Sequence, residues 1–357
     1  MKTLFKDPLF YKEWKNSKWI CILMTLILFW HKVNYISSQL DFFKDTTKGN
    51  QAMFDKMWFN KYLLSSGTDG IMLMAGPTLL LCILLFKGEK QDSTCDLLHS
   101  MPFTRKDIII SKIKVGILTI TIPFLINFIL LTCFYLNNKS YIGTSYMDIP
   151  KFYSINLLFI LFFFVFLVFM ETIVGQYFAA VVFSPIILTV PYMLTSYVVD
   201  LIRFTQGLQY DAFKFVSISK ISENLFIYGI IQSKPLLIDK KDINGEIIRD
   251  VDKLIYENFN IKIMILIVLI VVFSILAVII YKKVKLERVN KLIIFKPIET
   301  IFKWGVAICV GMIFSQIFGY PHKPEESANM PLIYTTLVIG TVIGYFISKL
   351  ALKFSNR

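Results

Sequence analysis

The chain has little charge and few of the residues that enzymes use for catalysis. Only 18% of its 357 residues are charged, whereas 55% are hydrophobic, and a soluble domain of this length could not bury so much apolar surface. Its three histidines and five cysteines show no spacing typical of a metal site or of a nucleophile beside a base. The dipeptide Gly-Lys does not occur, which excludes the usual phosphate-binding loop. We therefore expect an integral membrane protein with no catalytic residue, no metal site and no cofactor of its own.

Long apolar runs are what the sequence does have. A helix that crosses the bilayer core needs about 20 mainly apolar residues, and eight runs fit, so the predicted fold class is an all-α polytopic membrane bundle. The first run is the weakest, because it contains Lys32, which must reach an interface or line a polar cavity. The predicted spans are 19–36, 70–86, 115–138, 152–170, 172–199, 263–281, 304–321 and 327–348.

The basic residues predict the orientation of these spans. With eight spans, the segments on the side of the N-terminus are 2–18, 87–114, 282–303 and 349–357, together with a tight turn between the fourth and fifth spans. They carry 21 basic and 8 acidic residues, a difference that equals the whole net charge of +13. Because basic residues accumulate on the cytoplasmic side, we expect a multi-pass protein of the cell membrane with both termini cytoplasmic. Topology and contact with anionic membrane lipids explain the charge, so no nucleic-acid partner is expected.

Two segments are expected outside the membrane. In the extracytoplasmic loop, residues 201–262, an Asn-Gly pair between β-forming residues predicts a β-hairpin at 242–248. The other segment, 37–68, has apolar residues at helical spacing and predicts an amphipathic helix on the outer interface. The residues at that spacing are Met53, Phe54, Met57, Trp58 and Tyr62.

Three features allow two interpretations each. Glu171 is the only charged residue in 152–199; it is either part of a substrate or proton pathway or a structural acid that reaches headgroups or pairs with a neighbouring helix. Gly340 and Gly344 form a G-x-x-x-G pattern that permits close helix packing, within the monomer or between two copies. The basic segment 282–303 is either an amphipathic linker on the membrane surface or a docking site.

The segment 87–107 is the most informative part of the chain. It can form a short helix whose acidic start suits its N-terminus and whose apolar face contains Leu97 and Leu98. Pro102 ends that helix, and Thr104 can cap the next one, with Asp107 completing an approximate capping box. Since both ends lead directly into spans, a push on this segment would be transmitted into the bundle. An ordinary loop that serves orientation alone is the alternative.

The N-terminal segment 1–18 alternates aromatic and basic residues ahead of the first span. By this pattern it is an interfacial helix in which aromatic rings insert into the membrane and lysines contact phosphates. The predicted anchoring residues are Phe5, Phe10, Trp14 and Lys15.

These two segments resemble the permease subunits of type-2 ABC exporters. In that family the first cytoplasmic loop contains, in order, Glu, a small pair, Leu-Leu, Pro and Arg, followed by a Lys. The N-terminal Tyr11-Lys12-Glu13-Trp14, then Lys18-Trp19, is similar to the family's interfacial helix. The matching residues of the loop are Glu89, Ser93-Thr94, Leu97-Leu98, Pro102, Arg105 and Lys112.

The resemblance implies a coupling helix at 89–101 that contacts a separate ABC ATPase, which would bind ATP and Mg²⁺ and would act on two permeases, identical or related. The implied coupling residues are Glu89, Asp92, Thr94, Leu97, Leu98, Pro102 and Arg105. The chain departs from the family in having Ser93 where Gly is usual and eight spans instead of six. Its length is similar to that of the larger Gram-positive permeases linked to envelope stress or peptide-antibiotic resistance.

The resulting hypothesis is an exporter permease with four parts: 1–18, spans 1–5 within 19–200, the loop 201–262, and spans 6–8 within 263–357. Its substrate would be hydrophobic or amphipathic. Two other functions stay open, a membrane sensor or scaffold that transports nothing and a gradient-driven transporter that uses Glu171.

Overall fold

The computed structural model describes residues 8–46, 57–65, 67–90, 103–206, 226–241, 247–284, 291–320 and 329–355. They form two compact units. Unit 1 lies within Met1–Glu89, Ser93–Phe169 and Ile231–Lys282, and unit 2 within Lys90–Asp92, Met170–Ile230 and Lys283–Arg357.

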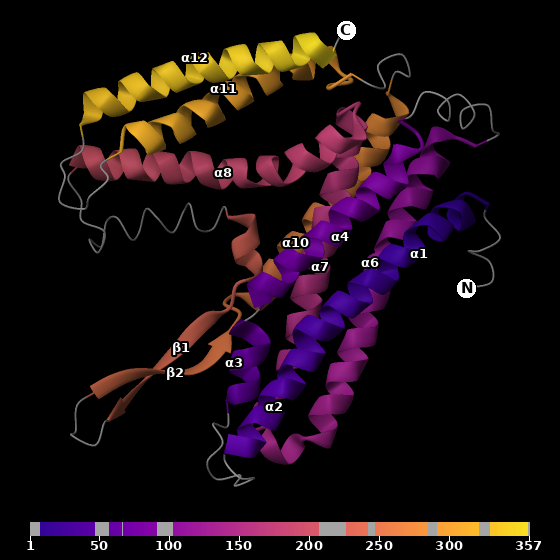
Figure 1. The fold of residues 1–357 in the computed structure, drawn as a ribbon, viewed down its shortest axis with the longest axis vertical. Helices are drawn as coiled ribbons and strands as arrows, with labels where there is room; N and C mark the ends of the chain where they lie inside the picture. Colours follow the sequence, from indigo (N-terminus) through magenta and orange to yellow (C-terminus); the bar gives the residue numbers. More distant parts are fainter. Residues whose placement is uncertain are drawn as a thin grey trace. The chain divides into compact units, whose positions relative to one another are not determined.

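Unit 1 is built from long helices that run side by side (Figure 1). The chain first forms one continuous helical segment made of α1 (Pro8–Leu28), the π-helical η2 (Phe29–Asn34) and α2 (Tyr35–Thr46). After α3 (Trp58–Ser65) come α4 (Gly67–Lys87), α6 (Arg105–Asn137), the short η4 (Lys139–Tyr141), α7 (Asp148–Ile173) as far as Phe169, and α10 (Phe259–Lys282). α1 packs against α4 and α6, and α6 against α10.

The hairpin predicted in the loop 201–262 is confirmed. β1 (Lys234–Lys241) pairs antiparallel with β2 (Ile247–Ile255), and the register shifts at Leu236/Leu237. A 3₁₀ turn, η5 (Ile227–Ile231), precedes β1. The Asn-Gly pair itself lies outside the described residues.

Unit 2 contains α8 (Tyr177–Gln206), α11 (Lys296–Phe318) and α12 (Met330–Ser355). α11 and α12 pack tightly, because a Cβ atom at Gly340 would lie 2.5 Å from Phe314 Cβ and one at Gly344 would lie 2.8 Å from Val310 Cβ. The G-x-x-x-G pattern therefore serves packing within the monomer, which was one of the two alternatives.

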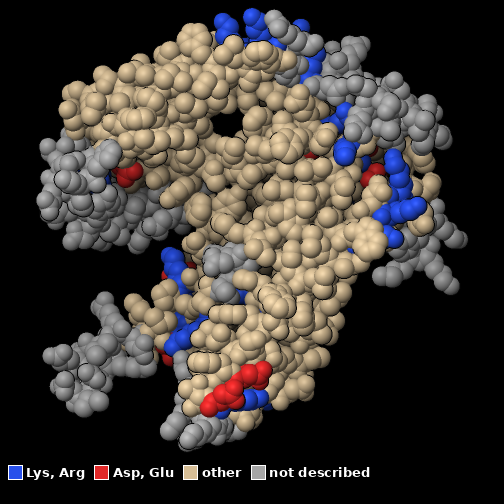
Figure 2. All heavy atoms as spheres, in the orientation of Figure 1, with Lys and Arg blue, Asp and Glu red and all other residues tan. Residues whose placement is uncertain are grey.

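The all-α membrane fold is confirmed. Each of the eight predicted spans coincides with a helix over most of its described residues. Seven helical segments of the described chain are long and apolar enough to cross a membrane. The described apolar part of α4, Met72–Lys87, is shorter. Figure 2 shows long uncharged flanks with the charged residues gathered near the helix ends. Exposed apolar residues on such flanks, as along α10, are what contact with lipid requires.

The helices differ from the prediction in several of their bounds; α6 begins at Arg105 instead of 115, and α8 ends at Gln206 instead of 199. The first helical segment extends to Thr46 rather than to residue 36, because its last part, α2, is amphipathic and buries Ile36 and Leu40 against the protein. The predicted amphipathic helix is present in its described part, α3, where Trp58, Phe59, Leu63 and Leu64 are buried within the protein; its place at the outer interface stays a prediction. Met53 and Phe54 lie outside the described residues.

Candidate functional site

The two ends of the segment 91–102 are fixed by local hydrogen bonds. Glu89 follows the last turn of α4, where its amide donates to Phe86 O at 3.1 Å. On the other side, Thr104 caps α6 with the full capping box that was predicted: its side chain accepts from the Asp107 amide, and the Asp107 carboxylate accepts from the Thr104 amide. The segment between them lies outside the described residues.

Lys112 is the centre of the charge cluster in unit 1. Its side chain is 1% exposed, and its ammonium donates to Glu13 Oε1 at 3.1 Å and to Leu85 O. It also lies 3.2 Å from Glu89 Oε1, an ion pair without hydrogen-bond geometry. The ring of Phe86 is 5.1 Å from the ammonium nitrogen. A buried ammonium is tolerated only with such partners.

The cluster joins four helices of unit 1. Glu13 comes from α1, Glu89 from the end of α4 and Lys112 from the second turn of α6. Tyr281, in the last turn of α10, donates its hydroxyl to Glu89 Oε2 at 2.9 Å. Both carboxylates thus meet the same lysine, and the helices that flank the segment 91–102 are connected directly to α1 and α10. We refer to Glu13, Glu89, Lys112 and Tyr281 as the charge cluster.

Unit 2 contains a second buried pair. The ammonium of Lys90 contacts the Glu171 carboxylate and donates to Glu171 O at 2.9 Å and to Val174 O at 2.7 Å. Glu171 is 1% exposed and Lys90 9% exposed. Val174 belongs to the turn between α7 and α8, which was predicted at this place. This lysine therefore stabilises the C-terminal end of α7, where carbonyl groups lack helical partners.

The same turn is fixed from its other side by the basic segment. Val174 pairs with Ile293 in an isolated β-bridge, with hydrogen bonds from Gly175 N to Leu292 O at 3.3 Å and from Ile294 N to Ile173 O at 3.0 Å. Leu292 and Ile293 are buried with Leu352 of α12. Residues 292–294 are thus anchored within unit 2 by backbone pairing and apolar contacts, and both interpretations of the segment 282–303 stay predictions.

The structure describes only some of the predicted site residues. Glu89 lies inside the charge cluster, and Arg105 is the partly exposed first residue of α6 and donates to Lys282 O at 3.4 Å. Glu171 pairs with Lys90, which is the structural alternative; a pathway role stays a prediction. The remaining predicted coupling residues lie outside the described residues, namely Asp92, Thr94, Leu97, Leu98 and Pro102.

The predicted membrane anchors differ in how far they are buried. Phe10 is 2% exposed and therefore packs within the protein instead of presenting its ring to lipid. Its burial follows from α1, which continues without a break into the bundle and turns Phe10 toward neighbouring helices. Lys15 is exposed and Trp14 partly exposed, so their interfacial role stays a prediction. Phe5 lies outside the described residues.

Sequence reasoning named Glu13 and Lys112 only as residues that match a family pattern, and it assigned no role to Lys90 or Tyr281. A signal existed for Lys112, which lies between three isoleucines at 108–110 and the apolar run that begins at residue 115, because a charge in such a place needs a partner. Nothing in the sequence showed which acid would be that partner. The contacts join residues that are 99 positions apart for Glu13 and Lys112 and 192 apart for Glu89 and Tyr281.

A comparison with known protein families gave a match. Residues 57–231 match the model of a family described as ABC-2 family transporter protein, a region that runs from α3 through the segment 91–102 to η5 and spans just under half of the chain. No curated protein and no solved structure gave a match. Together with the multi-pass helical fold, the family match supports an ABC-2 type permease, the membrane component of an ABC transporter.

Proposed function

We propose that this chain is the permease subunit of an ATP-driven ABC exporter in the cell membrane, with both termini in the cytoplasm. A separate ABC ATPase binds ATP and Mg²⁺ and hydrolyses the nucleotide. A second permease, identical or related, completes the membrane part. The substrate is a hydrophobic or amphipathic molecule such as a lipid, a peptide antibiotic or a cell-wall-related molecule, handled in the context of envelope stress. The family match supports the permease assignment, and the direction of transport and the substrate class rest on the resemblance described above.

The observation that carries the proposal is the charge cluster at the base of 91–102. Glu89 enters this segment and Lys112 follows it, and the two side chains contact each other at 3.2 Å. A displacement of the segment by an ATPase would therefore move α4 and α6 together. Glu13 and Tyr281 extend the connection to α1 and α10. Buried charge pairs transmit such a displacement well, because separating them costs several kcal/mol.

This geometry divides the predicted coupling residues into two groups. The Glu89 carboxylate points into the protein, where it meets Lys112 and Tyr281, so we assign it to transmission. We then assign contact with the ATPase to the residues between Glu89 and Thr104. Among these, Leu97 and Leu98 supply an apolar pair that can fill a groove on a partner surface.

The test replaces both Leu97 and Leu98 by Asp in the full-length protein. The protein is purified with its complex from its own membranes, and mass spectrometry identifies any co-purifying chain that contains a Walker A sequence. Vanadate-sensitive ATP hydrolysis is measured in nanodiscs. We expect the double variant to lose the ATPase and at least nine-tenths of the hydrolysis, because two buried carboxylates would oppose docking.

A matched control makes the same change at Leu236 and Leu237 on β1, where both side chains are exposed. This variant should keep the ATPase and its activity. If the Leu97/Leu98 variant retains a full complement of active ATPase, the coupling assignment is wrong. A wild-type protein that never co-purifies with an ATPase but binds an antibiotic would instead support the sensor or scaffold.

Glu171 distinguishes the exporter from a gradient-driven transporter. Lys90 and Glu171 pair in unit 2, and a buried pair can be replaced by apolar residues of similar volume with little loss of stability. The double variant Lys90→Met with Glu171→Leu should therefore fold and keep ATP-dependent transport in proteoliposomes. Loss of transport with intact ATPase binding would show that the Glu171 carboxylate serves the pathway.

A further inference from the structure

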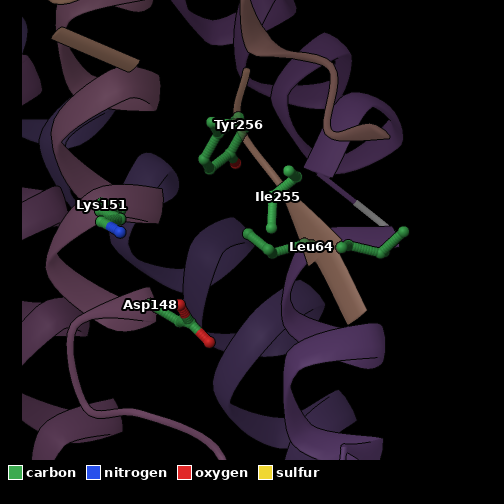
Figure 3. A pocket seen from close by; sticks show the side chains of 6 residues that line it. Leu64, Asp148, Lys151, Ile255 and Tyr256 are labelled. Carbon is green, nitrogen blue, oxygen red and sulfur yellow. The ribbon is translucent and has the colours of Figure 1, made fainter. Parts of the chain in front are cut away.

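A small pocket lies at the end of unit 1 where the hairpin joins the helices. Its walls come from three elements: Leu64 from α3, Asp148 and Lys151 from the first turn of α7, and Leu254, Ile255 and Tyr256 from β2 and the residue that follows it. Figure 3 shows Lys151 and Asp148 projecting from α7 toward the side where Leu64 and Ile255 lie. The pocket thus combines apolar walls with one carboxylate, one ammonium and one phenol.

Asn60 fixes the carboxylate side of this pocket. Its side-chain amide donates to Asp148 Oδ2 at 2.8 Å and to Leu254 O at 3.2 Å, and its Oδ1 accepts from the Leu254 amide at 2.7 Å. Asn60 is 1% exposed. These three hydrogen bonds hold Asp148 and the end of β2 in place without filling the pocket. The carboxylate therefore keeps its second oxygen available for a ligand.

The two charges that line the pocket do not neutralise each other. Asp148 and Lys151 are one helical turn apart on α7, a spacing at which oppositely charged side chains can pair. No ion pair joins them, and the Lys151 ammonium makes no polar contact with any residue in the described part of the chain. The pocket therefore offers one negative and one positive group side by side.

Tyr256 adds a buried hydroxyl. The residue is 9% exposed, and its Oη has no hydrogen-bond partner among the described residues. The nearby Asn156 Oδ1 also has no hydrogen-bond partner among the described residues. Burial raises the pKa of the Tyr256 phenol, which keeps the hydroxyl protonated and able to donate. Buried polar groups normally have a partner, so this donor indicates a missing one.

The size of the pocket limits what it can bind. Its volume is about 60 Å³, whereas one water molecule needs roughly 10–15 Å³ measured in this way. The space suits a group of a few non-hydrogen atoms and excludes an entire antibiotic or acyl chain. Because the lining is neutral overall, a ligand with a single net charge would leave one protein charge without a counterpart.

We propose that this pocket binds a headgroup-sized zwitterion whose primary ammonium contacts Asp148 and whose anionic group contacts Lys151 and the Tyr256 hydroxyl. Two sources carry this chemistry: the headgroup of an aminophospholipid and a free small molecule such as an amino acid. The site uses none of the residues of the charge cluster. The proposed binding site can therefore be tested independently of coupling to an ATPase.

The test uses full-length protein in phosphatidylcholine nanodiscs, titrated by calorimetry with O-phosphoethanolamine and with glycine. Phosphocholine is the control ligand, because its quaternary ammonium has no N–H to donate to Asp148. We expect saturable binding of at least one primary-ammonium probe and at least tenfold weaker binding of phosphocholine. Asp148→Asn and Lys151→Gln should each weaken the probe by at least tenfold. Asp41→Asn and Lys139→Gln, at exposed positions of the same unit, should leave its affinity unchanged.

Further arms separate the two sources. Glycine binding without phosphoethanolamine binding assigns the site to free amino acids. Retention of phosphatidylethanolamine by wild type but not by Asp148→Asn, measured by native mass spectrometry after exchange into mixed lipid, assigns it to the bilayer. If neither soluble probe binds and the two proteins retain the lipid equally, the proposal is overturned. Asp148→Asn keeps the size of the side chain, so a folded variant with unchanged binding would contradict it as well.

Discussion

The two ends of unit 1 use charge in opposite ways. At one end, Glu13, Glu89 and Lys112 meet in a closed cluster whose charges contact one another. At the other end, Asp148 and Lys151 line an open pocket without pairing. α10 connects the two, because it begins at Phe259, three residues after the pocket residue Tyr256, and contains Tyr281 in its last turn; its 24 residues span about 36 Å at 1.5 Å per residue.

The comparison teaches what a charged residue does in a membrane protein of this kind. A charge that is fully paired and buried costs a great deal to disturb and therefore holds helices together. A charge that stays at a pocket without a partner contributes little to stability and is available to a ligand. The two ends should therefore respond to mutation in opposite ways, the first in stability and the second in binding.

The largest effect is expected for Lys112→Met, which would leave the carboxylates of Glu13 and Glu89 buried without their shared cation. Removing one member of a buried ion pair typically costs about 3–5 kcal/mol, so this variant should unfold at a clearly lower temperature or fail to accumulate. Thermal unfolding in detergent, followed by tryptophan fluorescence, measures the effect. Lys114→Met, at an exposed position of the same helix, is the control and should change little.

A triple variant keeps that prediction decisive even if Lys112→Met does not fold. Replacing Lys112 by Met together with Glu13→Gln and Glu89→Gln removes all three charges, and much of the lost stability should return. If Lys112→Met alone were as stable as Lys114→Met, the cluster would not hold the helices together.

The next effect is expected at the pocket end, where Asn60→Ala removes three hydrogen bonds. It would leave the partly buried Leu254 amide without its acceptor, and an unsatisfied buried group costs about 1–3 kcal/mol. The same thermal measurement applies, with Ser38→Ala as the control, since the Ser38 hydroxyl bonds only within its own helix at an exposed position. A loss of zwitterion binding without any loss of stability would mean that Asn60 positions Asp148 and does not support the hairpin.

A smaller effect is expected for Tyr281→Phe in the charge cluster. The change removes one hydrogen bond to Glu89 while Lys112 keeps its contact, so we expect a loss of about 1.5 kcal/mol, the low end for bonds to charged groups. Tyr345→Phe in α12, whose hydroxyl makes no hydrogen bond with the described residues, is the control. In the Lys112→Met background, Tyr281→Phe should cost a different amount, since the two side chains share Glu89 as a partner.

The fold could be predicted from the sequence because each of its main features depends on neighbouring residues. Continuous apolar runs place the helices, Thr104 and Asp107 form their capping box within one turn, and an Asn-Gly pair lies between the two strands. Lys32 was expected to reach an interface or line a polar cavity. Instead its ammonium donates to Leu63 O at 3.0 Å over the ring of Phe152.

The candidate site was less predictable because its contacts are distant in the sequence. Glu89 was recognised, but as a contact for a partner; its inward direction depends on Lys112 and Tyr281, and neither position alone reveals that they meet. The pocket depended on Asn60, an ordinary polar residue within a predicted surface helix. Its role follows from two hydrogen bonds with Leu254, 194 positions away. Such distant pairs are fixed by the packing of whole helices, which a single sequence does not specify.

The smallest effect on stability is expected for Lys151→Gln, and it completes the comparison with Lys112. Both residues are lysines on long helices of unit 1, but the Lys151 side chain is exposed and has no ion pair with the described residues. Substitutions at such positions usually change stability by no more than about 0.5 kcal/mol, so the unfolding temperature should match that of wild type. A large loss of stability would mean that the ammonium already has a structural partner, and the pocket would then not have a free positive group to offer. An unchanged unfolding temperature combined with lost zwitterion binding would show that the two ends of unit 1 divide structure and recognition between them.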